Sequence, residues 1–188
     1  LNLLEYVPMS INFLQDFFFL NRSVVLFIYG QVFFILGLSI FLQSRRYSRL
    51  KLARHLRWMA AFGVLHGFHE WGMVFIPVQK AYMTDNAIDI LHMLHLLLLS
   101  LSFLCLLKFG LEMLETNRYI NASLFVLPAI WVIIFIYALN NYSETAEWVN
   151  LSSVWSRYLL GAPGAFAASF GLYQFTHEAK LISDQRSY

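Results

Sequence analysis

Charged residues are scarce in this sequence. Only 13% of its 188 residues are Asp, Glu, Lys or Arg, whereas 59% are hydrophobic and 18% are aromatic, and the mean hydropathy is +0.59. An ordinary soluble domain carries about 25% charged residues, so the composition excludes a protein of that class. The chain is therefore predicted to be an integral membrane protein whose main partner is the lipid bilayer.

Cysteine is almost absent as well. The single cysteine, Cys105, excludes an intrachain disulfide framework and a metal site built from several cysteines. Because this residue lies in an apolar run, we expect it to be a small, buried, hydrophobic side chain.

Long apolar segments make up most of the chain. A transmembrane helix needs roughly 20 mostly apolar residues, and five segments qualify: 24–43, 56–76, 87–107, 119–139 and 154–175. Residues 1–22 are interrupted by Glu5, Pro8 and Asp16, which predicts an interfacial or partly inserted helix. The predicted fold is all-α, a polytopic transmembrane helical bundle of about five spans. It forms one domain over 1–188, with a helix over 1–22, a bundle over 23–177 and a cytoplasmic tail or linker over 178–188.

A dense basic stretch, residues 45–57, separates the first two spans. It could be a nucleic-acid-binding patch, but a loop between two spans follows the positive-inside rule, so we expect no nucleic acid as a partner and assign no role to His55 within it. With this loop inside, ten Lys and Arg residues lie on the inner side and three on the outer side. A multi-pass protein is therefore predicted, with its N-terminus outside and its C-terminus in the cytoplasm.

The boundaries of the later spans depend on single residues. Pro77 is expected to end the second span, and residues 140–153 are expected to form an acidic, aromatic loop. Arg157 then falls at the head of the fifth span, where we expect it to extend to the membrane surface. The same span is rich in small residues, which allow a neighbouring helix to approach closely: Gly161, Gly164, Ala165, Ala168 and Gly171.

Four of the six histidines form two similarly spaced pairs, each accompanied by a carboxylate: His66, His69 and Glu70 on the second span, and Asp89, His92 and His95 on the third. On each helix these residues share one face. Both pairs are also similarly distant from the middle of the connecting loop, so they are predicted to lie at one depth, in the outer half of the membrane. Gly63 and Gly67 flank His66 and would let a neighbouring helix or a flat ligand come close.

A lone intramembrane histidine is often a hydrogen-bonded packing residue, and that interpretation stays open for the cluster. Four histidines with carboxylates at one depth nevertheless favour a site, because ionisable residues inside a bilayer are costly. Neutral imidazole suits transition metals, and we expect Zn, Cu or Fe bound by the four histidines. Glu70 and Asp89 could be further ligands or could orient imidazole N–H groups. Haem b, with one axial histidine from each span, is the alternative.

Two stretches, 43–71 and 157–165, resemble the N-terminal membrane regions of bacterial sensor histidine kinases and of related signalling proteins such as diguanylate cyclases. The resemblance rests on the runs His66-Gly67-Phe68-His69-Glu70-Trp71 and Tyr158-Leu159-Leu160-Gly161-Ala162-Pro163-Gly164. It implies a sensory input domain of a two-component or related signal-transduction protein in the bacterial inner membrane. A downstream kinase or cyclase module is then expected as a partner, because these residues contain no catalytic domain, and we expect a homodimer.

A second function remains open from the same residues. The chain could be a small membrane metalloenzyme or a b-type cytochrome-like electron carrier, with the histidines doing chemistry on a lipid, quinone or oxygen and Glu70 as the proton acceptor. The chain ends abruptly after a polar tail, and we expect it to be a fragment of a longer protein.

Overall fold

The computed structural model describes residues 9–46, 51–114 and 122–185. Every element within these ranges is a helix, which confirms the predicted all-α class. The elements in chain order are α1 (Met9–Leu20), α2 (Arg22–Arg46), α3 (Lys51–Gln79), α4 (Asp85–Met113), α6 (Ser123–Asn141), α7 (Thr145–Ser156), η1 (Arg157–Gly161) and α8 (Ala162–Gln185). The predictions that involve Glu5, Pro8, Arg49, Arg118 and Arg186 fall outside the described residues.

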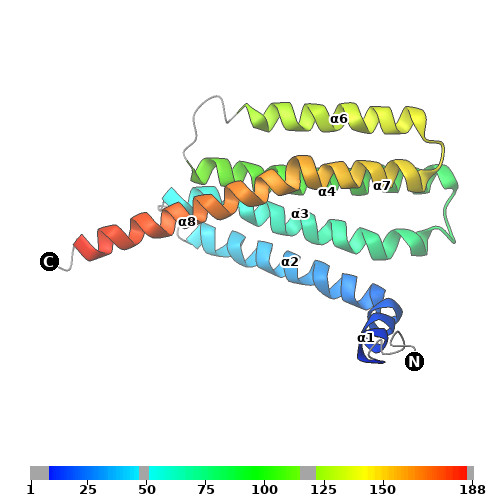
Figure 1. The fold of residues 1–188 in the computed structure, drawn as a ribbon, viewed down its shortest axis with the longest axis horizontal. Helices are drawn as coiled ribbons and strands as arrows, with labels where there is room; N and C mark the ends of the chain where they lie inside the picture. The colour runs from blue at the N-terminus through cyan, green and yellow to red at the C-terminus, as the bar shows by residue number, and fades with distance from the viewer. Residues whose placement is uncertain (1–8, 47–50, 115–121, 186–188) are drawn as a thin grey trace, which may run out of the picture.

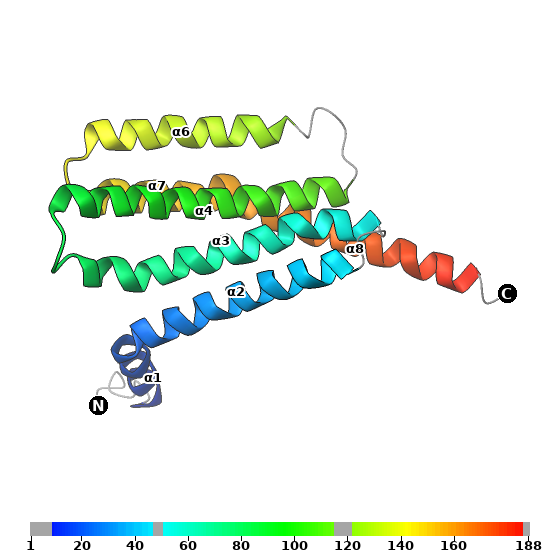
Figure 2. The same ribbon diagram turned by 180° about the vertical axis from the view of Figure 1, so that it is seen from behind.

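Four helices lie side by side in the order α2, α3, α4 and α6, and the helix formed by α7, η1 and α8 crosses one face of this layer (Figures 1 and 2). α3 and α4 are adjacent and antiparallel, joined by residues 80–84, as their short connection predicts. We call the end of the bundle that carries this connection the turn end. The C-terminal part of α8 projects from the opposite end (Figure 1).

Among the described residues, three helical segments are long and apolar enough to cross a membrane: Arg22–Arg45, Asp85–Met113 and Ser123–Asn141. They correspond to the first, third and fourth predicted spans. The first and last of them also leave large apolar side chains exposed, including Ile28 and Ile133, as helices that face lipid do. α3 lies outside this set because its histidines, tryptophans and charged residues dilute its apolar character.

Two predicted boundaries are wrong. Pro77 does not end the second span, because it lies inside α3, which continues to Gln79. The third helix also extends beyond its predicted span of 87–107, since α4 continues to Met113. Here Lys108 and Glu112 lie one turn apart, with Nζ and Oε1 at 3.5 Å, and stabilise the helix as an i,i+4 pair.

His55, which was assigned no role, also takes part in this region. Its Nδ1 lies 3.0 Å from one carboxylate oxygen of Glu112, and the indole N–H of Trp58 donates to the other oxygen at 3.0 Å. The Glu112 carboxylate thus joins α3 to α4 at the end of the bundle opposite the turn end.

The expected loop over 140–153 is wrong as well, because α7 begins at Thr145. Trp148, Ser152 and Ser156 follow one another at four-residue intervals and are all buried. The small serines let α7 pack closely on α4 and α6: Ser156 shares a 2.9 Å hydrogen bond with Ser100, and the Trp131 indole donates to the Ser152 carbonyl at 3.2 Å. Some of the polar residues that suggested a loop therefore form the interface of α7 with α4 and α6.

One turn of π-helix, η1, connects α7 to α8 without a break. The Ala162 N–H donates to the Arg157 carbonyl, five residues back. Pro163 follows directly, and because proline has no N–H and its ring excludes the carbonyl four residues earlier, the α-helical pattern is interrupted here. A π-turn absorbs this irregularity while the helix continues.

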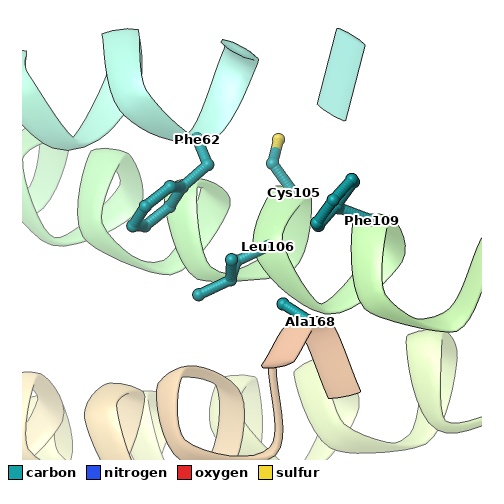
Figure 3. Close-up of a cluster of buried hydrophobic side chains, with 5 residues drawn as sticks. All are labelled: Phe62, Cys105, Leu106, Phe109 and Ala168. Atoms are coloured by element: carbon teal, nitrogen blue, oxygen red, sulfur yellow. The ribbon is translucent and has the colours of Figure 1, made fainter. Parts of the chain in front are cut away.

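Small residues bring neighbouring backbones together, as the sequence predicts for both glycine-rich segments. A Cβ atom on Gly37 of α2 would lie 2.6 Å from the Val64 nitrogen of α3, and one on Gly63 would lie 2.8 Å from the Gly37 Cα. α8 approaches α4 in the same way, with Gly110 against the Ala168 backbone. α3, α4 and α8 enclose a core cluster of Phe62, Cys105, Leu106, Phe109 and Ala168 (Figure 3), in which the free cysteine is buried as predicted.

Candidate functional site

His69 of α3 and His95 of α4 meet ring against ring. Their centroids are 4.0 Å apart with an interplanar angle of 10°. Each ring also bonds to the other residue's backbone: His69 Nδ1 lies 3.2 Å from the His95 carbonyl, and His95 Nε2 lies 2.8 Å from the His69 carbonyl. Gly72 leaves room for this arrangement, because a Cβ there would lie 2.5 Å from the His95 ring. The two histidine-bearing segments therefore meet at one depth.

These hydrogen bonds fix the tautomer of each ring. A carbonyl oxygen can only accept, so His69 carries its proton on Nδ1 and His95 carries its proton on Nε2. The remaining nitrogen of each neutral ring then offers a lone pair, and it makes no hydrogen bond within the described residues. An imidazole whose other N–H is held by a carbonyl is typical of a metal-binding histidine.

His66 lies beside this pair, with its ring centroid 5.8 Å from that of His69. The Ser102 hydroxyl donates to the Leu99 carbonyl at 2.7 Å, so its oxygen accepts from His66 Nδ1 at 3.1 Å. The other ring nitrogen, Nε2, lies 3.5 Å from Oε1 of Glu70. Because Nδ1 already carries a proton, this last contact is attractive only if a second proton is present, either on His66 Nε2 or on the Glu70 carboxyl group.

A cavity of about 620 Å³ opens between α2, α3, α4, α7 and η1 toward the turn end. Small-molecule and cofactor sites range from roughly 300 to 1,000 Å³, so this volume suits an organic ligand. His69, His92 and His95 contribute to its wall, whereas His66 does not. The other lining residues are Arg22, Ser23, Leu26, Gly72, Met73, Ile76, Pro77, Leu96, Ala146, Val149, Asn150, Ser153 and Arg157.

His92 is the polar group in this wall that the fold leaves unsatisfied. Its Nδ1 atom is buried and has no hydrogen-bond partner, and its Nε2 forms no hydrogen bond within the described residues either. A buried polar atom without a partner costs free energy and calls for an explanation such as a ligand. His92 also lines a smaller cavity of about 280 Å³, together with Asp85 and Asp89.

The predicted site residues thus divide into groups. His69, His92 and His95 share the cavity, and His66 and Glu70 form a buried pair next to it. Asp89 is instead bonded to Thr145 of α7, whose hydroxyl donates to its carboxylate at 2.6 Å.

No group of three or more His, Cys, Asp or Glu residues in the described ranges is arranged to hold a metal ion. The stacked rings explain this in part. Their in-plane lone pairs lie in two nearly parallel planes, so His69 and His95 cannot both point at one ion. Binding of a metal ion by the six predicted residues stays a prediction, and one that would require these rings to move.

Arg22 and Arg157 are charged cavity residues that were not predicted to belong to a site. Arg157 begins η1 within the continuous α7–η1–α8 helix, about 18 Å from Thr145 at 1.5 Å per residue, and its side chain is exposed, so its position at the membrane surface stays a prediction. Its charge acts on His69, His95 and Glu70. The signal that could have revealed it is Pro163, which follows within two turns and marks an irregular helix.

Comparisons with known proteins add no assignment: no protein-family model, curated protein or solved structure matches this chain.

Proposed function

We propose that this chain is the membrane-embedded sensory input region of a bacterial signal-transduction protein of the histidine kinase type, and that it binds haem b in the cavity. Five helices, α2, α3, α4, α6 and α7–η1–α8, would span the inner membrane, with α1 at the outer surface. The concentration of Lys and Arg around residues 45–57 supports an inner position for that end of the bundle. The turn end and the cavity would then face the outer leaflet.

The observation that carries the proposal is the unsatisfied imidazole of His92 in the wall of a ligand-sized cavity. Inside a membrane there is no water to satisfy such a ring, so the fold retains a polar group that a ligand would complete. An iron atom would accept the lone pair of one nitrogen. For this reason we assign His92 as the residue that would hold the haem iron.

The cavity favours haem over a bare ion. A single ion fills a small fraction of about 620 Å³, whereas Leu26, Met73 and Leu96 supply apolar walls suited to a porphyrin. His69 and His95 lie in the same wall with one free lone pair each, close enough to contact such a ligand. Bound haem would supply redox or gas-binding chemistry, while the protein residues bind, orient and exclude water.

The link to an output module is the helix that leaves the cavity. Arg157 lines the cavity, and the same helix continues through Gly164 and Ala168 along α4 before it projects from the bundle (Figure 2). A ligand that moves η1 relative to α4 would therefore move the end of α8. This continuity supports a sensory role and a kinase or cyclase module downstream.

The test is an absorption spectrum of the detergent-purified chain titrated with hemin, combined with metal analysis of protein never exposed to a chelator. We expect a stoichiometric Soret band in wild type, and we expect His92→Ala to lose most of it because the axial nitrogen is gone. His177→Ala is the matched control, since His177 is exposed on α8 away from the cavity and should bind hemin as wild type does.

Each outcome is informative. Stoichiometric metal without a Soret band would replace haem by a Zn, Cu or Fe ion. Neither metal nor a Soret band would refute a cofactor at this site. Equal hemin binding by wild type, His92→Ala and His177→Ala would overturn the assignment of the axial ligand.

The sensory role needs its own readout. Fusing α8 in register to the catalytic half of a well-behaved sensor kinase should produce autophosphorylation that changes when hemin is added. A fusion that is active but indifferent to hemin, while the Soret band is present, would favour the b-type cytochrome-like electron carrier instead.

A further inference from the structure

Arg157 is an exposed cation in the wall of the cavity. It begins the π-turn η1, about 18 Å along the helix from the first residue of α7. Ionisable side chains within a membrane-spanning helix are rare, and a guanidinium there normally has an anionic or carbonyl partner. π-turns are themselves frequent at functional sites.

The described residues give Arg157 no such partner. It forms no hydrogen bond and no ion pair with any of them. The carboxylate of Glu70 is directed at His66 Nε2, at 3.5 Å. The charge of Arg157 acts on Glu70 without a direct contact.

A second arginine faces the same space. Arg22, the first residue of α2, lines the cavity together with Arg157, and none of the described lining residues is acidic. Asn150 and Ser153 of α7 add polar groups on the same side. Both arginines are exposed, so an anionic group entering this largely apolar cavity can reach two cations, and a ligand that displaces water from them would strengthen the attraction.

We propose that the cavity binds an amphipathic ligand through its anionic group, with Arg157 and Arg22 as the residues that hold this group and the apolar wall as the contact for the rest. The proposal deepens the haem assignment, on which it rests for the identity of the ligand, because the propionates of haem are carboxylates. A lipid carboxylate or phosphate would present the same chemistry.

The test compares hemin with hemin dimethyl ester, in which both propionates are neutral while the iron and the ring are unchanged. In wild type we expect the ester to bind about tenfold to a hundredfold more weakly, the range for lost charge-assisted hydrogen bonds. Arg157→Gln should weaken hemin binding by a similar factor and leave ester binding unchanged. Arg157→Lys, which keeps the charge, should lose less.

Arg54→Gln is the matched control, because Arg54 is exposed near the opposite end of α3 and should not affect either compound. If hemin binds but the ester binds equally well, or if Arg157→Gln binds hemin like wild type, the anion site is refuted while haem binding stands. The two proposals therefore fail separately.

A lipid source is tested with oleate and its methyl ester. If hemin does not bind at all, the haem assignment fails, and thermal stabilisation by oleate that requires Arg157 would retain the anion site with a lipid as its ligand. Equal stabilisation by oleate and methyl oleate, or none by either, would overturn the anion site as well.

Discussion

The reciprocal contact between His69 and His95 is a specific prediction about what holds α3 to α4. His69→Phe or His95→Phe keeps a flat ring of similar size and removes one N–H donor. The carbonyl that loses this donor belongs to a helix and retains its backbone hydrogen bond, so no polar group is left unsatisfied. Each substitution therefore measures one side-chain hydrogen bond with little contribution from packing.

The magnitude follows from the two contacts. Inter-helix hydrogen bonds in membranes contribute about 0.6 kcal/mol on average and up to about 1.7 kcal/mol. The His95 contact, at 2.8 Å, is the shorter, so His95→Phe should cost more than His69→Phe, whose contact is 3.2 Å. Each bond also orients the ring on which the other ring stacks, which adds a coupling of about 0.5–1 kcal/mol between the two positions.

Unfolding free energies of wild type, both single variants and the double variant in mixed detergent micelles form a double-mutant cycle that isolates this coupling. His177→Phe, at an exposed position, is the control. Additive effects with no coupling, or a double variant as stable as wild type, would refute the reciprocal contact. Nitrogen NMR provides a second test, since His69 should be protonated on Nδ1 and His95 on Nε2; the same tautomer at both residues would contradict the geometry.

Two further predictions concern the rest of the bundle. Gly37→Ala should destabilise the protein by about 1–3 kcal/mol, because its Cβ meets the backbone of α3, whereas Gly30→Ala should cost less because it meets the movable Trp71 side chain; thermal unfolding of both variants in detergent checks the order. Glu112→Gln should cost about 0.5–1 kcal/mol by removing the charge that faces His55, and the loss should shrink at high salt; an equal loss at low and high salt would contradict the ion pair.

The meeting of the histidine helices could be predicted because a short connection fixes the geometry. Residues at equal distance from the turn end of two antiparallel helices share one depth, so the two histidine pairs were predicted to lie at the same level. The partner of each ring could not be predicted in the same way. A rotation of about 100° per residue decides which side chain faces the neighbouring helix, and Ser102, which accepts from His66, has no feature in the sequence that marks it.

The start of the last helix could not be read from hydrophobic periodicity. α7 buries Ser152 and Ser156 completely, and buried serines contribute no apolar signal although they allow the closest packing. Glu144 and Glu147 nearby strengthened the appearance of a loop. The prediction failed because a polar pattern was equated with exposure to water.

The helix that replaces the expected loop matters for function, because it carries Arg157 to the wall of the cavity. Pro163 positions the π-turn, and the π-turn places Arg157 opposite the α4 face that carries His92 and His95. C-terminal to the π-turn, α8 packs against α4 through Gly164 and Gly110, where the backbones of the two helices approach closely. A ligand that contacts both α4 and η1 therefore acts on the π-turn, whereas α8, which continues the same helix, is packed against α4. A change in the bound ligand should therefore alter the geometry of the π-turn first. This turn is where we expect the proposed sensor to convert ligand binding into movement of α8.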